Sequence, residues 1–161
     1  MDPHSNTATA STAGAQPATG RFRSPADVRW FLAALRRARI VRRQLTEPLP
    51  GTIAALAAMA PVRPPTPEVA WVAAVRASGR LRQLAGGPDT CLVRALIAGA
   101  LLAARGDVRL SLGFRPGEAG AAADGHAWIA GFDFELGRDA AAGPEYAPAL
   151  SLPFTSTGSR P

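Results

Sequence analysis

Residues 89–115 read DTCLVRALIAGALLAARGDVRLSLGFR, and the periodicity of the sequence changes within them. The apolar run over residues 91–104 has helical length and follows Asp89 and Thr90, two residue types that cap helix N-termini. Over residues 108–114, apolar and polar side chains alternate, which is the pattern of a half-buried strand. This stretch therefore predicts a helix followed directly by a strand.

Three more helices are predicted upstream, each opened or closed by proline, glycine or an N-capping hydroxyl. They cover residues 25 to about 44, 52–60 and 67–85. Spacings of three and four residues predict a buried stripe on three of the four helices. The stripes consist of Val28, Phe31, Leu32 and Leu35 on the first helix, Val69, Val72, Val75 and Leu81 on the third, and Leu92, Leu96, Ile97 and Leu101 on the fourth.

Two short strands are expected after the first one. The second covers residues 126–131, and a turn at Gly131 leads into the third, in which Phe132, Phe134 and Leu136 alternate with polar residues. Helices that precede a small antiparallel sheet predict an α+β fold. We expect a single domain over residues 21–149, helical over 21–105 and sheet over 107–139, between a disordered tail at 1–20 and a loose tail at 150–161.

Composition narrows the class of protein. The 161 residues suffice for one core, with 47% hydrophobic and 19% charged residues. All basic residues are arginine, and the net charge of +6 favours acidic partners. A single cysteine cannot form an intramolecular disulfide, and the longest apolar run, residues 95–104, is too short for a membrane span. With no signal-peptide pattern at the N-terminus, we expect a cytoplasmic protein without membrane association.

The first predicted helix carries many cations opposite its apolar stripe. Three interpretations remain open: a solvated helix face, a docking surface for an acidic peptide or partner protein, and a nucleic-acid contact. The last is the least favoured, because no aromatic residues are interleaved with the arginines and no nucleic-acid motif accompanies them. The cations are Arg29, Arg36, Arg37, Arg39, Arg42 and Arg43.

Two residues carry the chemistry that the sequence predicts. Cys91 begins the fourth helix, where the helix dipole and free backbone N–H groups favour a thiolate. His126, in the second strand, is the base that a nucleophilic thiol requires. The alternative is that Cys91 is a small buried hydrophobe and His126 a hydrogen-bonded residue of the sheet, with Trp128 packed on the same strand face. One cysteine and one histidine in the ordered region are too few for a zinc site, so neither metal nor cofactor is expected.

The residue that would orient the imidazole is less defined. Asp139, just beyond the third strand, is the first choice, and Asp133 and Glu135 are rivals, whereas Asp124 is expected in a turn. The backbone N–H of Cys91 is the natural oxyanion donor. Gln83 is a poorer second donor because it lies within a helix.

The cysteine segment, the strand and the segment His126-Ala127-Trp128-Ile129 together resemble the leader peptidases of lasso peptide biosynthesis, within the transglutaminase-like, papain-related superfamily. The resemblance covers roughly residues 21–139. It implies a cysteine endopeptidase that removes the leader from a ribosomally made precursor, with Cys91 as nucleophile, His126 as base and Asp139 as third member. The family often has an acid after this segment, where this chain has Ala130.

The resemblance also implies partners. The chain is too short for the winged-helix recognition domain that some relatives carry, so a separate leader-binding protein is expected. The other two expected partners are the precursor peptide and an asparagine-synthetase-like cyclase. Two other functions remain open: an acyltransferase or transglutaminase that uses the same thioester chemistry, and a non-catalytic adaptor that binds an acidic leader through its arginines.

Overall fold

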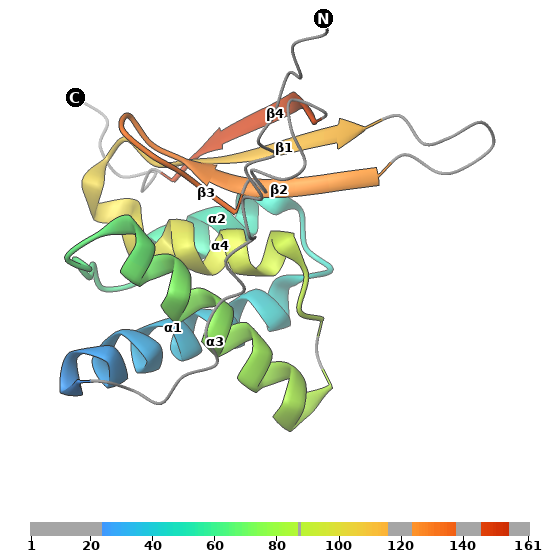
Figure 1. Ribbon diagram of the computed structural model, residues 1–161. Helices are drawn as coiled ribbons and strands as arrows, with labels where there is room; N and C mark the ends of the chain where they lie inside the picture. The colour runs from blue at the N-terminus through green and yellow to red at the C-terminus, as the bar shows by residue number, and fades with distance from the viewer. Residues whose placement is uncertain (1–23, 87, 116–123, 138–145, 155–161) are drawn as a thin grey trace, which may run out of the picture.

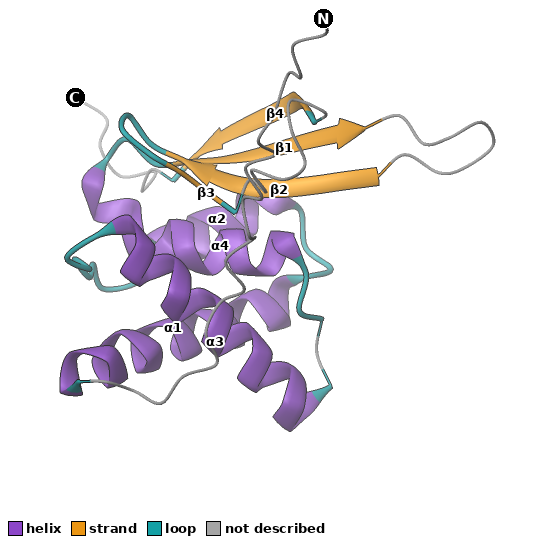
Figure 2. Cartoon of the chain, in the orientation of Figure 1, coloured by secondary structure: helices purple, strands orange, loops and turns teal. Residues whose placement is uncertain are grey.

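The computed structural model describes residues 24–86, 88–115, 124–137 and 146–154, and its helices all lie on one face of an antiparallel sheet (Figure 1, Figure 2). The predicted order, helices before a small antiparallel sheet in an α+β fold, is confirmed. The expected disordered tail at residues 1–20 lies outside the described residues. The elements are α1 (Pro25–Gln44), α2 (Leu49–Ala57), α3 (Pro67–Ala85), α4 (Cys91–Leu102), the 3-10 helix η1 (Ala103–Arg105), β1 (Arg109–Arg115), β2 (Asp124–Ala130), β3 (Glu135–Leu136) and β4 (Ala147–Pro153).

Helix α4 lies at the centre of the fold, between the sheet and the other helices (Figure 1). Every residue from Ala95 to Leu102 is buried. Gly99 allows the sheet to approach the helix, because a Cβ at this position would overlap the ring of Phe154 and come within 2.9 Å of Ile129 Cδ1. The predicted helix is confirmed, and its N-terminus is held against both the sheet and α3.

Helix α1 has the predicted ends, but the expected buried stripe is only partly correct, because Phe31 and Leu35 pack against the core and the other two residues do not. Ser24 and Asp27 form a capping box, which fixes the first turn. The side chains of Val28 and Leu32 are 38% and 50% exposed, whereas the face toward the core carries smaller residues and one arginine. The buried residues of α1 are Trp30, Ala34, Arg37, Ala38 and Val41.

The expected stripe of α3 is also only partly correct, because Val69 and Leu81 pack against the core but Val72 is 39% exposed. The fully buried residues of α3 are Ala70, Ala73, Ala74, Ala77 and Ser78. Alanines on facing helices allow the backbones to approach closely, so α1 and α3 pack through small residues and leave several larger ones at the margin. Hydrophobic spacing therefore predicted the helices but only part of the face that each one buries.

Arg37 is buried, although the sequence placed it on the charged face of α1. Its guanidinium donates hydrogen bonds to the backbone oxygens of Ala33 at 3.1 Å and Ala60 at 3.0 Å. Burial lowers the pKa of this guanidinium, and the charge of Arg36 adds to the effect. The side chain thus joins α1 to the segment that follows α2.

Helix α2 begins three residues earlier than expected and ends at Ala57. Pro50 and Gly51 lie in its first turn instead of breaking the chain before it. Proline is tolerated there because the first N–H groups of a helix have no partner within the helix.

The sheet has the strand order β3-β2-β1-β4. Strand β3 is shorter than predicted, because residues 131–134 form the turn, closed by a hydrogen bond from Gly131 N to Phe134 O at 2.9 Å. The expected loose tail from residue 150 is wrong through residue 154. Strand β4 pairs with β1, and Phe154 is 2% exposed. Residues 155–161 lie outside the described residues.

Candidate active site

Cys91 is the first residue of α4, and Thr90 is its N-cap. The Thr90 hydroxyl accepts a hydrogen bond from Val93 N at 3.4 Å, which leaves the backbone N–H of Cys91 without a role in the cap. The thiol is half-buried against the edge of the core. The sulfur lies in the first turn of α4, at the positive end of the helix dipole.

Asp89 fixes the start of α4 against α3. Its Oδ1 accepts hydrogen bonds from Ser78 Oγ at 2.7 Å and from Arg94 Nε at 2.8 Å. The bond from Arg94 is the largest cause that lowers the pKa of this carboxyl; Ser78 contributes in the same direction, and partial burial opposes both. The carboxylate therefore sits two residues before Cys91 as an anchor and not as a base.

His126 lies on β2, opposite Gly113 of β1. Because Ala127 and Ile129 are buried in the core with α4, strand alternation places His126 on the other face of the sheet, as predicted together with Trp128. Trp128 is 2% exposed and covers Gly113, where an added Cβ would lie 2.9 Å from the indole. The His126 and Trp128 rings are roughly parallel, with centroids 6.3 Å apart.

One ring nitrogen of His126 is held by the backbone. The distance from Nε2 to the carbonyl oxygen of Gly137 is 2.5 Å. A carbonyl can only accept, so Nε2 carries the proton and donates it. In the neutral ring, Nδ1 is then unprotonated and can act as a base.

Tyr146 completes a polar cluster that the sequence did not predict. Its hydroxyl donates to Asp124 Oδ2 at 2.6 Å, and its ring centroid lies 5.1 Å from that of His126. Arg115 donates to the same carboxylate oxygen at 2.8 Å and lies over the Tyr146 ring. Asp124, expected in a turn, is instead the first residue of β2, opposite Arg115. The register of β1 and β2 creates this cluster, and no local sequence signal marks it.

Hydrogen bonding within the cluster shifts two pKa values. The bond from Tyr146 is the largest cause that lowers the pKa of Asp124, and the charges of Arg115 and His126 act in the same direction. The same bond raises the pKa of the Tyr146 phenol, with a further rise from the charge of Cys91. Tyr146 is therefore in ring contact with His126 and within electrostatic range of Cys91.

The two predicted catalytic residues lie in the same region but are not hydrogen-bonded to each other in the described part of the chain. Cys91 is on the helix side of the sheet, and the alternation of β2 directs His126 to the other side. Gly125, the residue before His126, has no side chain of its own, and the ring of Phe114 lies beside it, with Cε1 3.2 Å from where a Cβ would be.

The structure shows the surroundings of two of the three candidates for the third site residue, Asp133 and Glu135. Asp139 lies outside the described residues. Asp133 is in the turn after β2, 62% exposed, and its Oδ1 accepts from Arg105 at 3.0 Å. Glu135 pairs with Ala130, four residues along β2 from His126. Gln83, the weaker oxyanion candidate, is exposed and accepts a bond from Arg80.

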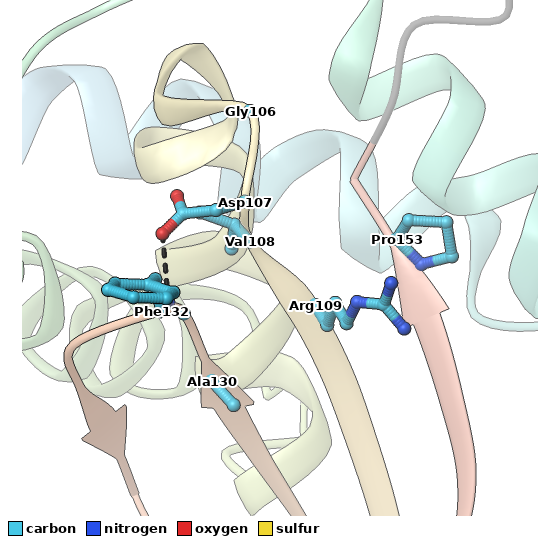
Figure 3. Close-up of a pocket in the computed structure, with 8 residues that line it drawn as sticks. Gly106, Asp107, Val108, Arg109, Ala130, Phe132 and Pro153 are labelled. Atoms are coloured by element: carbon cyan, nitrogen blue, oxygen red, sulfur yellow. Dashed lines mark hydrogen bonds between the residues drawn. The ribbon is translucent and has the colours of Figure 1, made fainter.

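A surface hollow of about 390 Å³ lies at the other end of β2 (Figure 3). Its lining includes Arg109, Ala130 and Pro153, and Asp107 Oδ2 accepts from Phe132 N at 2.9 Å there. The hollow contains none of the predicted catalytic residues. It lies where the hydrogen bond between Phe132 N and Asp107 joins the end of β2 to the start of β1. Because no predicted catalytic residue lines it, we assign it no catalytic role.

Known proteins give no further constraint: no protein-family model, curated protein or solved structure matches this chain. Within the described ranges, no group of three or more His, Cys, Asp or Glu residues is placed to hold a metal ion. The described helices also include none that is long and apolar enough to cross a bilayer.

Proposed function

We propose that this chain is a cysteine endopeptidase with a transglutaminase-like core, which removes the leader from a lasso precursor peptide in the cytoplasm. Cys91 is the nucleophile and His126 the base. One observation carries the proposal: the bond from His126 Nε2 to the Gly137 carbonyl leaves Nδ1 as the basic atom in a chain whose only thiol, Cys91, begins α4.

The proposed reaction uses these groups in order. Nδ1 of His126 takes the proton of the Cys91 thiol, and the sulfur attacks the carbonyl carbon at the junction of leader and core. The Cys91 N–H stabilises the oxyanion, and the imidazolium protonates the leaving amine, which is the N-terminus of the core. Water then hydrolyses the thioester and releases the leader.

Asp139 is retained as the third residue of the proposal. It follows Gly137, whose carbonyl holds His126, by two residues, the same separation along the chain as Glu135 on the other side. The two rivals are less favoured because Asp133 is paired with Arg105 and Glu135 pairs four residues away from His126.

The proposal places leader recognition on a separate protein and ring closure on a cyclase. The freed amine of the core is the nucleophile that a macrolactam-forming enzyme requires. The basic surface of the chain, with a net charge of +6, is consistent with an acidic leader or partner.

The test is cleavage of a precursor encoded beside this gene, in the presence of its leader-binding protein, followed by mass spectrometry. Cys91→Ala and the near-isosteric Cys91→Ser are expected to leave the precursor intact while circular dichroism stays unchanged. Hydrolysis adds one water to the cut fragments, whereas addition of an amine would indicate an acyltransferase. Cleavage by both variants at the wild-type rate would overturn the assignment and favour the adaptor.

A further inference from the structure

The outward face of α1 carries apolar and cationic side chains that the core of the fold does not use. Val28 and Leu32 are 38% and 50% exposed, and Arg36, Arg39 and Arg43 are exposed. Spacings of three and four residues align these five side chains along one stripe of the helix. We call this set, Val28, Leu32, Arg36, Arg39 and Arg43, the α1 stripe.

The cations of the stripe have no counter-charge among the residues that the structure describes. Arg36, Arg39 and Arg43 form no ion pair with any residue in the described ranges. The one acid of the helix, Asp27, is engaged in the capping box with Ser24. The stripe therefore presents unneutralised positive charge beside exposed apolar surface.

The helix that presents the stripe is fixed at several points. The capping box holds its first turn, and Arg37 ties its middle to Ala60. Near its end, Arg42 donates to Ala85 O of α3 at 2.9 Å. A partner would thus meet a preformed surface and would not pay the entropy of ordering it.

We propose that the α1 stripe docks an acidic amphipathic segment of another polypeptide. Leucine-type side chains of that segment would cover Val28 and Leu32, and its carboxylates would pair with Arg36, Arg39 and Arg43. The inference goes beyond the proposed peptidase activity and does not depend on it. The stripe lies on a helix that Figure 1 places away from the sheet carrying His126.

Other occupants fit the stripe less well. A second copy packed about a two-fold axis would bring arginines against arginines. A bilayer requires a broad apolar face, and here the exposed apolar residues are few and interspersed with cations. Duplex DNA would neutralise the arginines through its phosphates, but its backbone offers nothing apolar to cover Leu32.

The test uses full-length protein with Cys91→Ala, so that binding is measured without cleavage. The probe is a fluorescent synthetic peptide with leucines on one helical face and glutamates beside them, followed by fluorescence anisotropy. A scrambled peptide of the same composition is the control probe. We expect the amphipathic peptide to bind about tenfold more tightly than the scrambled one.

Matched variants locate the site. Leu32→Ser and the pair Arg36→Glu with Arg39→Glu are each expected to weaken binding about tenfold, whereas Leu84→Ser on α3 and Arg63→Glu in the preceding loop leave it unchanged. Each variant is checked by circular dichroism. Equal binding of the scrambled peptide, equal loss in the control variants, or binding to anionic vesicles or duplex DNA but not to the peptide would each overturn the proposal.

Discussion

The imidazole of His126 is held by the backbone carbonyl of Gly137, with 2.5 Å between Nε2 and the oxygen. This backbone carbonyl fixes the tautomer of His126 without the help of a side chain. The orientation of the imidazole therefore depends on the backbone conformation of Gly137. Gly137 has a φ of 80°, a conformation that other residues rarely adopt. The geometry of the candidate base is therefore coupled to local backbone stability.

Gly137→Ala is expected to lower both stability and cleavage. The new Cβ would overlap the indole of Trp71 in a left-handed backbone conformation, at a cost of about 1–3 kcal/mol of unfolding free energy. Urea denaturation followed by tryptophan fluorescence measures this. Gly51→Ala in α2 is the control, because a Cβ there meets nothing within 4 Å. A Gly137→Ala protein as stable as wild type would contradict the strain argument.

Substitution of the carboxylates should separate the three candidates for the third site residue. We expect His126→Ala to reduce kcat about 10²–10⁴-fold. Because the carbonyl of Gly137 already accepts the Nε2 proton, the reduction of kcat in Asp139→Asn should be at least tenfold smaller than that. Asp133→Asn and Glu135→Gln should cleave at the wild-type rate. If Asp133→Asn or Glu135→Gln caused the largest loss among the three carboxylate variants, the assignment of Asp139 would fail.

Tyr146 is the only tyrosine of the chain, so its tyrosinate absorbance can be titrated alone. Its pKa is raised above the ordinary value of about 10, chiefly by the bond to Asp124. Asp124→Asn is expected to lower this pKa toward the value measured in guanidinium. The unchanged near-ultraviolet dichroism of the variant would show that the fold persists. A wild-type phenol that titrates at its denatured value would contradict the hydrogen bond.

The sequence predicted local features better than faces and long-range pairing. Caps such as Ser24 and Thr66 are local, so the ends of α1 and α3 were correct. Their buried faces were only partly correct, because the alanine contacts between the two helices leave no hydrophobic periodicity. Strand β4 was missed because most of its residues are exposed and because Pro148 and Pro153 obscure the alternating pattern of a strand. Prolines are tolerated here because β4 is an edge strand.

In the candidate site, too, local features could be predicted from the sequence and long-range contacts could not. The positions of Cys91 at a helix start and of His126 on a strand were predicted correctly, because residue type and order indicate them. Tyr146 and Asp124 were not, since they meet only through the pairing of β2 with β1 and the return of the chain into β4. Contacts made by register cannot be derived from spacing along one chain.

Asp89→Asn should show, through the pH dependence of stability, how strongly Asp89 anchors the start of α4. The folded pKa of Asp89 is lowered, chiefly by Arg94, so its carboxylate contributes stability above the unfolded pKa of about 3.9, and this contribution is lost as the pH falls through the folded value. At neutral pH the variant is expected to be about 1–3 kcal/mol less stable than wild type. The difference should shrink as the pH falls below about 4.

Urea denaturation of Asp89→Asn and wild type across this pH range tests the linkage, with Asp133→Asn as the control. Asp133 is also paired with an arginine, but it is 62% exposed, whereas the Asp89 side chain is 11% exposed. An exposed pair contributes less than about 1 kcal/mol, so the control should show little effect at any pH. A stability difference for Asp89→Asn that stays constant down to acidic pH would mean that the bond to Arg94 does not hold the start of α4. The position of Cys91 would then depend on the Thr90 cap and on packing alone.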